Sequence, residues 1–231
     1  MVKLLDTTLR DGSYVIDFQF TDKDTAIISS LLDDAGVHYI EVGHGLGLYA
    51  GTKDNMRAAV ADEAYLDATS SVVKNGKWGM FFIPGIGRME DIELAAKYKM
   101  DFIRIGTNVS EILLSEPFIK RAKKLGMYVC ANYMKTYAVS PEDVGKQAAV
   151  SETYGADLVC IVDSAGGMFP EDVEAYISSI RKHSTVAVGF HGHNNLGLAI
   201  ANTLKAVELG VDMVDTSVRG MGRSAGNAVT E

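Results

Sequence analysis

Two histidines near residue 190 have a spacing that would let both contribute to one metal site. In Val186–Asn195, apolar residues alternate with small or polar ones, which is the period of a β-strand. His191 and His193 are two residues apart, so both imidazoles leave the strand end on the same side. Neutral imidazole is the commonest metal ligand in proteins. A lone pair of this kind is also compatible with a surface or hydrogen-bonded role, so the rest of the chain must decide.

A carboxylate and a cation follow the first apolar run of the chain. Asp11 offers a hard oxygen ligand, and Arg10 places a fixed positive charge beside it. One carboxylate and two imidazoles with open positions suit a catalytic divalent metal. No thiolate belongs to this set, which favours Mn²⁺, Mg²⁺ or Co²⁺ over a structural Zn²⁺.

These side chains must be positioned by a repeating strand–helix pattern. Eight short apolar runs read as strands: Lys3–Leu9, Tyr39–Gly43, Trp78–Pro84, Asp101–Thr107, Met127–Met134, Asp157–Asp163, Val186–His191 and Met213–Val218. Seven amphipathic segments between them read as helices: Thr21–Ala35, Asn55–Lys74, Arg88–Lys99, Glu111–Leu125, Pro141–Tyr154, Pro170–Lys182 and Leu196–Leu209.

The repeat of roughly 30 residues runs through 1–231 without a linker, so we expect one domain. Eight parallel strands predict an α/β fold of the (β/α)₈ TIM-barrel type. An open doubly wound sheet is the alternative, but no Gly-x-Gly-x-x-Gly follows the first strand.

The segment after the last predicted strand, Arg219–Glu231, carries no helical pattern. The barrel is therefore expected to lack its eighth outer helix and to leave the outer faces of strands eight and one uncovered. An apolar patch of that size rarely faces water. We expect either a truncated chain or cover from another segment or a second subunit, which makes a homo-oligomer the expected state.

In the seventh strand every second residue is expected to face the same side as His191. The same alternation in the other strands predicts that polar side chains face one shared interior. Each one alone could serve only to bond a neighbouring strand, but so many buried charges are costly unless they are paired or liganded. The side chains expected inside are Asp6, Thr8, Arg10, Glu41, Arg104, Asn132, Asp163, Asp215 and Ser217.

Composition narrows the classes of partner. The 231 residues are 47% hydrophobic and 23% charged, with a net charge of −8 and scattered basic residues. Nucleic acid and anionic membrane surfaces are therefore not expected as partners. Cys130 and Cys160 each lie in an apolar run and read as buried thiols of a reducing compartment. With no export signal or membrane-spanning run, the expected location is the cytoplasm.

Three motifs in order give the chain a family resemblance. They are Asp6-Thr7-Thr8-Leu9-Arg10-Asp11-Gly12, His191-Gly192-His193-Asn194-Asn195-Leu196-Gly197, and Gly220-Met221-Gly222 through Gly226-Asn227. Together they resemble the DRE-TIM metallolyase (HMGL-like) superfamily. Within it, Ile40–Leu48 and Val162–Gly166 are most similar to the 4-hydroxy-2-oxovalerate aldolase branch. On spacing alone, the glycine-rich Gly220–Asn227 would read as a plain flexible loop.

The resemblance implies a metal-dependent lyase. Asp11, His191 and His193 would ligate a divalent metal, with Mn²⁺ the first candidate and Asn227 a possible fourth ligand. The metal would bind a 2-oxo acid substrate, and Arg10 would stabilise the enolate oxygen that develops on bond cleavage. The reaction implied is cleavage or formation of a carbon–carbon bond in a small 4-hydroxy-2-oxo acid, giving pyruvate and an aldehyde.

The resemblance also places residues around the substrate. Ser164, Asn132, Glu41 and Arg104 are expected to contact the substrate. Tyr14 stands where the aldolase branch has a histidine base, and a phenol with an ordinary pKa of about 10 is a poor base at neutral pH. His44 or water on the metal are the other candidates for the base.

Other functions stay open. A Claisen-type acyltransferase of the isopropylmalate or homocitrate synthase kind would use the same metal site, although Ser13 stands where those enzymes carry an acidic or amide residue. A Schiff-base aldolase would use Lys135. A barrel that binds metal or an oxo acid without turnover is the third alternative. The helical region with which the aldolase branch docks an acylating aldehyde dehydrogenase is absent, so that partner is not expected.

Overall fold

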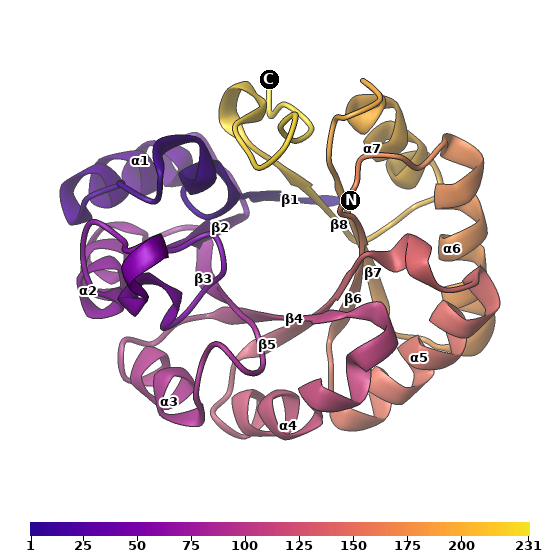
Figure 1. Ribbon diagram of the computed structural model, residues 1–231, viewed down its shortest axis with the longest axis horizontal. Coiled ribbons are helices and arrows are strands. Elements are labelled where there is room, and N and C mark those ends of the chain that lie inside the picture. Colours follow the sequence, from indigo (N-terminus) through magenta and orange to yellow (C-terminus); the bar gives the residue numbers. More distant parts are fainter.

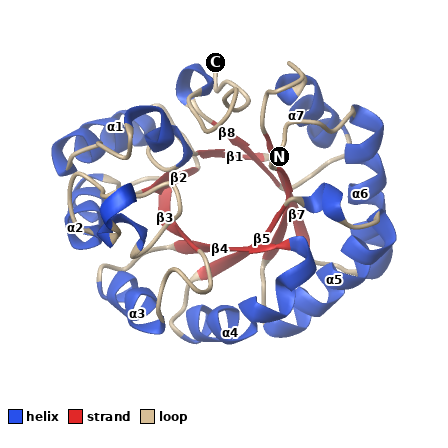
Figure 2. Ribbon diagram, viewed as in Figure 1, coloured by secondary structure: helices blue, strands red, loops and turns tan.

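A computed structural model describes residues 1–231 as a closed barrel of eight parallel strands in the order β1 to β8. Figure 2 shows the strands as a ring enclosed by helices. The (β/α)₈ prediction is confirmed, and the open sheet is excluded. The strands are β1 (Lys3–Asp6), β2 (Tyr39–Val42), β3 (Lys77–Phe82), β4 (Phe102–Asn108), β5 (Tyr128–Met134), β6 (Leu158–Asp163), β7 (Ala187–Gly192) and β8 (Met213–Thr216).

Seven α-helices surround the barrel, one after each of the first seven strands (Figure 1). They are α1 (Asp22–Asp34), α2 (Asp62–Val72), α3 (Met89–Lys97), α4 (Glu116–Lys124), α5 (Pro141–Tyr154), α6 (Pro170–His183) and α7 (Ala199–Glu208). The helix predicted over Asn55–Lys74 begins seven residues later, at Asp62. The Asp62 carboxylate accepts the Tyr49 amide at 2.6 Å, which ties the start of α2 to the preceding loop.

Helix ends follow local signals in the sequence. Thr21 caps α1 by accepting the Asp24 amide, while the Asp24 carboxylate accepts the Thr21 amide, a complete capping box. Ser140 caps α5 ahead of Pro141, and Gly155 ends that helix at φ 101°. These local interactions explain why the predicted bounds of α5 agree with the structure.

The barrel wall separates two apolar clusters. The larger one packs between strands and helices and includes Ile40, Phe82 and Phe190. The smaller one fills the bottom of the barrel and includes Leu5, Tyr39, Phe102, Cys130, Leu158, Cys160, Val162 and Met213. Above that small layer the inward positions become polar. The barrel floor is therefore apolar, and the polar side chains lie towards the carboxyl ends of the strands, where active sites lie in this fold.

The parity prediction is wrong for Asp6 and for Asp163, whereas Arg10, which follows the strand, does reach the interior and contacts Glu41. Leu5 pairs with Tyr39 of the inner cluster, so Asp6, which pairs with Ile40 of the outer cluster, faces outward. Its carboxylate accepts the Thr8 amide at 2.9 Å. Asp163 follows the inward Val162 and accepts the Gly167 and Met168 amides instead.

The segment after β8 also differs from expectation. Residues 217–231 turn through η6 (Val218–Gly220) and lie between α1 and α7 (Figure 1). Thr230 shares a hydrogen bond with Thr216 at 2.8 Å, and the side chain of Val214 is 5% exposed. This segment thus covers the outer face of β8 at Thr216. Four of the exposed apolar side chains lie on the flanking helices: Ile27 and Leu31 of α1, and Ile200 and Leu204 of α7.

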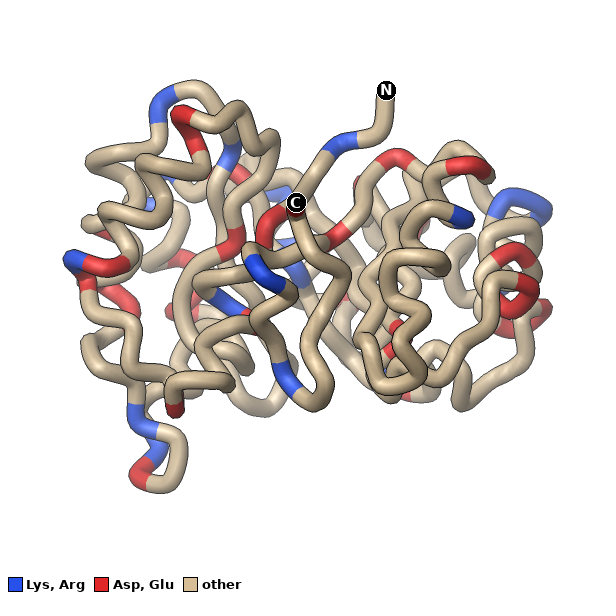
Figure 3. The backbone as a smooth tube through the Cα atoms, turned by 90° about the horizontal axis from the view of Figure 1, so that it is seen from above, with Lys and Arg blue, Asp and Glu red and all other residues tan.

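Charged residues of both signs are interspersed along the chain (Figure 3). None of the helices combines the length and the hydrophobicity needed to cross a bilayer. Cys130 and Cys160 are buried free thiols, as the sequence predicts.

Candidate active site

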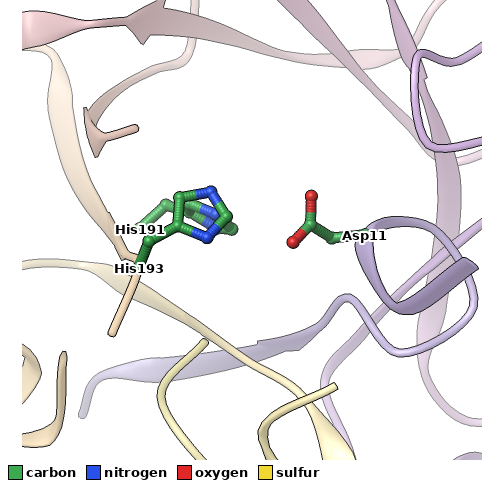
Figure 4. Close-up of side chains that lie close together, drawn as sticks. All are labelled: Asp11, His191 and His193. Carbon is green, nitrogen blue, oxygen red and sulfur yellow. The ribbon is translucent and has the colours of Figure 1, made fainter. Parts of the chain in front are cut away.

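Three side chains that could hold a metal ion meet at the carboxyl end of the barrel. The ligand atoms of Asp11, His191 and His193 all lie within 4.8 Å of one another, and the three residues are buried. The histidines come from the end of β7, and Asp11 begins η1 (Asp11–Ile16), the turn that follows β1. Figure 4 shows the Asp11 carboxylate facing both imidazoles. The structure therefore brings together the three residues that the sequence singles out.

The electrostatics of the cluster hold these groups in the states that bind metal. Burial opposes ionisation of Asp11, but the Arg10 cation, helped by the hydrogen bond from Asn227, outweighs it and holds the Asp11 pKa well below its usual range. Burial, with a smaller contribution from His191, lowers the pKa of His193 to about 4. An ionised carboxylate and a neutral imidazole are what a divalent cation requires. The His193 Nδ1 atom is buried without a hydrogen-bond partner, which also fits an incoming ligand.

A hydrogen bond to Asp215 of β8 fixes the orientation of the His191 ring. Its Nδ1 lies 2.8 Å from the Asp215 Oδ2 atom. Since an ionised carboxylate can only accept, Nδ1 carries the proton and Nε2 keeps its lone pair. A carboxylate in this position fixes the tautomer and raises the basicity of a ligating histidine.

Arg10 is held in a fixed orientation beside the cluster. Its Nε donates to the Glu41 Oε2 atom at 2.7 Å, and its Nη1 donates to the Asp11 Oδ1 atom at 2.8 Å. The guanidinium also lies over the Phe81 ring, 4.8 Å from its centroid. Nη2 makes no hydrogen bond within the chain, so this side chain keeps a free donor.

Glu41 and Arg104 connect the two sides of the site. The Glu41 Oε2 atom accepts from Arg10 and also from Arg104 Nη1 at 3.0 Å. Arg104 Nη2 in turn donates to Asp215. The buried charges therefore alternate in one continuous chain of contacts that begins and ends at metal-ligating residues: Asp11, Arg10, Glu41, Arg104, Asp215 and His191.

A small cavity of about 60 Å³ opens onto the cluster. That volume is room for roughly four to six water molecules, which suits a molecule of few atoms. Asn132 and Ser164 line the cavity as expected of substrate contacts, whereas Glu41 and Arg104 do not line it. The full lining is Arg10, Asp11, Tyr14, Gly45, Leu46, Phe81, Ile83, Asn132, Met134, Val162, Ser164, His191, His193 and Arg223.

Tyr14 lines the cavity with a protonated phenol. Its ring packs edge-on against Phe18 and lies so close to Gly45 that a Cβ there would be 2.3 Å from a ring carbon. Burial raises the pKa of Tyr14. Tyr14 is therefore a proton donor at neutral pH.

His44 is not free to act as the base. Its Nε2 lies 2.9 Å from the Met56 carbonyl oxygen, and its Nδ1 accepts the Leu46 amide at 3.1 Å. Because both ring nitrogens are engaged and the residue does not line the cavity, the structure gives this alternative no support.

The glycine-rich segment Gly220–Asn227 packs onto the metal-ligating cluster. Asn227 Nδ2 donates to the Asp11 Oδ2 atom at 2.9 Å, while its buried Oδ1 has no partner. A Cβ at Gly222 would lie 2.4 Å from Asn227 Nδ2, so only glycine permits this approach. The same segment brings Arg223 to the cavity. Sequence reasoning does not find Arg223, although its place beside the third motif is a signal.

Lys135, the alternative nucleophile, is exposed and lies outside the cavity lining. A Schiff-base lysine needs a desolvated place beside the substrate. The geometry therefore favours the metal site over the lysine.

Comparison with known proteins agrees with this geometry. The family model described as HMGL-like matches residues 1–231. The 4-hydroxy-2-oxovalerate aldolase of Carboxydothermus hydrogenoformans is 46% identical over 230 residues, covering 100% of this chain and 68% of that protein. The oxaloacetate decarboxylase of Mycobacterium tuberculosis is 41% identical over 228 residues, covering 99% of this chain and 67% of that protein.

Solved structures share the fold. The N-terminal domain of a provisionally named aldolase from Bacteroides vulgatus superposes with a TM-score of 0.83 at 30% identity, covering 99% of this chain and 77% of that one. The carboxyl transferase domain of Rhizobium etli pyruvate carboxylase with pyruvate has a TM-score of 0.84 at 18% identity, covering 99% of this chain and 42% of that one. The second likeness shows the fold alone. The full-length family match, together with the clustered Asp11, His191 and His193, leads to one conclusion: the chain belongs to the HMGL-like family.

Proposed function

We propose that this protein is a metal-dependent aldolase that cleaves, or forms, a carbon–carbon bond in a small 4-hydroxy-2-oxo acid, giving pyruvate and an aldehyde. The observation that carries the proposal is the meeting of Asp11, His191 and His193 with the fixed guanidinium of Arg10 at one small cavity. The relatives named 4-hydroxy-2-oxovalerate aldolase support it.

Asp11, His191 and His193 would hold the divalent metal, with Asn227 as a fourth protein ligand. When bound, the ion supplies Lewis acidity that polarises the 2-oxo group of the substrate. The nitrogen and oxygen donor set, without thiolate, supports Mn²⁺, with Mg²⁺ or Co²⁺ as the other choices.

Arg10 is proposed to stabilise the charge that develops during cleavage. When the C3–C4 bond breaks, its electron pair passes towards the 2-oxo oxygen and gives an enolate, and protonation at C3 then gives pyruvate. The free Nη2 of Arg10 is held in place by the bonds of Nε and Nη1 to Glu41 and Asp11. A donor fixed before the reaction stabilises developing charge without reorganisation. The Nδ2 of Asn132 and the hydroxyl of Ser164 are available to orient the substrate carboxylate.

Glu41 and Arg104 are proposed to act as positioning residues. Neither lines the cavity, but Glu41 holds Arg10 and Arg104 holds Asp215. Through these contacts they set the orientation of Arg10 and His191.

Aldol cleavage also moves the proton of the 4-hydroxyl group. Tyr14 is the cavity residue that replaces the family histidine, and we propose that its phenol donates a hydrogen bond to the 4-oxygen. Because burial raises the Tyr14 pKa, the side chain is better suited to hold this oxygen in place than to remove its proton.

A second candidate function is decarboxylation of a 2-oxo acid with a carboxylate on C3, such as oxaloacetate. Here the C3–C4 bond breaks with loss of carbon dioxide and gives the same enolate, without any hydroxyl proton to remove. The observation in its favour is that the cavity offers a phenol with a raised pKa in place of a histidine base. The oxaloacetate decarboxylase relative supports it.

The test is release of pyruvate by metal-stripped protein that has been reloaded with Mn²⁺. We expect turnover of 4-hydroxy-2-oxopentanoate or oxaloacetate that is abolished by EDTA and by His191→Ala. Borohydride treatment in the presence of substrate should not inactivate the enzyme. Borohydride trapping with no effect of EDTA would support the Lys135 alternative and reject the metal site, while stoichiometric metal with no turnover would support a binding protein.

We also propose a cytoplasmic location, supported by the two buried free thiols. A homo-oligomer is proposed from the exposed apolar side chains of α1 and α7, and sedimentation would test it.

A further inference from the structure

Arg223 is a cation at the cavity without a carboxylate partner. Its guanidinium makes one weak contact, from Nη2 to the Ser164 carbonyl oxygen at 3.4 Å. By contrast, Arg10 and Arg104 each contact two carboxylates. The Nε and Nη1 donors of Arg223 remain free beside a cavity that it lines.

The backbone around Arg223 is fixed by several hydrogen bonds. Its own amide donates to the Asp11 Oδ2 atom at 3.2 Å, and its carbonyl accepts from Gly226 at 3.1 Å. The neighbouring Ser224 hydroxyl donates to the Asn195 Oδ1 atom at 2.9 Å. This anchoring places the guanidinium beside the loop after β6, where a ligand in the cavity would meet it.

A count of charges at the site favours a ligand with two negative charges. In the buried part of the site, three carboxylates (Asp11, Glu41 and Asp215) face two guanidinium groups (Arg10 and Arg104) when the histidines are neutral, while Arg223 lines the cavity from an exposed position. A divalent metal adds two positive charges. One carboxylate of a ligand would balance the buried charges, and a second carboxylate would give the guanidinium of Arg223 the partner that it lacks within the chain.

We infer that Arg223 binds a second carboxylate and that the substrate is therefore a dicarboxylic 2-oxo acid. The inference rests on the proposed function and narrows it. A 4-hydroxy-2-oxo diacid would break its C3–C4 bond, with the electron pair leaving as the enolate. The hydroxyl proton would pass to solvent water and a proton from solvent would be taken up at C3, so that the products would be pyruvate and a 2-oxo acid with no net gain or loss of protons. Oxaloacetate belongs to the same class.

The cavity also contains a feature that favours the opposite outcome. Leu46, Ile83 and Met134 give it an apolar wall, which would suit the methyl group of a monocarboxylate. A decisive experiment must therefore compare two substrates that differ only in this group. 4-Hydroxy-2-oxoglutarate and 4-hydroxy-2-oxopentanoate are such a pair, with a carboxylate and a methyl group on C4, respectively.

The experiment measures the ratio of kcat/KM for the diacid over the monoacid with Mn²⁺-loaded protein. We expect Arg223→Ala to lower this ratio by about 10- to 100-fold, the range of one charge-assisted hydrogen bond. Arg223→Lys should keep part of this ratio, because the positive charge remains although the paired donors of the planar guanidinium are lost. Arg219→Ala is the matched control. It removes the same charge from an exposed position of the same segment outside the cavity lining, and the ratio should not change.

Binding provides a readout that does not depend on turnover. 2-Oxoglutarate and 2-oxopentanoate differ in the same way, and titration calorimetry should show tighter binding of the diacid that is lost in Arg223→Ala. Cleavage of both substrates with an unchanged ratio in Arg223→Ala would overturn the inference and leave the aldolase proposal standing. Cleavage of neither substrate, with diacid binding that still depends on Arg223, would overturn the aldolase proposal and retain the dicarboxylate site.

Discussion

His191 donates from Nδ1 to the Asp215 Oδ2 atom, at 2.8 Å, and the same oxygen accepts from Arg104. One carboxylate oxygen thus joins His191 to the buried ion-pair chain. Because that chain continues through Glu41 to Arg10, the proposed metal ligands and the cation proposed to stabilise the enolate are held by one scaffold.

Asp215→Asn should weaken metal binding without unfolding the barrel. The amide can still accept from His191, but it lacks the charge that raises the basicity of the imidazole. We expect the Mn²⁺ dissociation constant to rise by about 10- to 100-fold. Calorimetric titration measures it, circular dichroism checks the fold, and an unchanged affinity would show that Asp215 does not tune the site.

His191→Ala and His193→Ala should each remove stoichiometric metal and activity while the barrel stays folded. The strands around β7 are buried by apolar residues such as Val188 and Phe190, which these changes leave in place. Metal analysis after dialysis measures the loss. Full metal content in both variants would refute the proposed site.

Arg10→Lys should retain metal and lose most of the rate. A lysine cannot donate to Glu41 and Asp11 at once and still present a free donor to the substrate. We expect kcat to fall by at least about 100-fold, with a smaller change in KM. Arg88→Lys, at an exposed arginine outside the cavity lining, is the control and should behave like the unaltered enzyme.

The free energy of unfolding should depend on pH through His193. Its pKa is lowered from 6.5 to about 4 in the folded protein, mainly by burial. The unfolded chain therefore binds the proton more readily, so stability present above pH 6.5 is lost as the pH falls towards 4. Between pH 7 and 4.5 the expected loss is roughly 2 to 3 kcal/mol.

Urea unfolding in EDTA, compared between the unaltered protein and His193→Asn, isolates this contribution. The subtraction is needed because burial raises the pKa of Asp62 to about 6, which changes stability in the opposite direction over the same range. Equal pH dependence in both proteins would show that His193 titrates normally.

Tyr14→Phe should separate the two candidate reactions. If the phenol holds the 4-hydroxyl oxygen, aldol cleavage should slow by at least about tenfold, while oxaloacetate decarboxylation should change less. Since the Tyr14 pKa is raised, a donor role also predicts no rise of the aldol rate between pH 7 and 9. A rate that rises tenfold per pH unit in the unaltered enzyme and is flat in Tyr14→Phe would instead identify Tyr14 as the base.

Much of the fold follows from the sequence because its signals are local. Alternation within Ala187–Gly192 and the caps Thr21 and Ser140 involve residues close in the chain. The outward direction of Asp6 could not be predicted in the same way. Apolar residues stand at both Leu4 and Leu5, so the alternation does not show which face is inner, and only pairing with β2 decides it.

The same distinction between local signals and contacts of distant residues applies to the candidate site. The sequence by itself determined the eight-strand repeat and the identity of Asp11, His191 and His193, because strand period and motif spacing are properties of the chain. The alternation also predicted Glu41, Arg104 and Asp215 inside the barrel, but only the tertiary structure decided how they pair with one another and with the site. Glu41, Arg104 and Asp215 come from β2, β4 and β8, and Arg223 reaches the cavity from the last loop. Contacts among residues so far apart in sequence arise only when the barrel closes, since closure alone brings the strand ends around one interior.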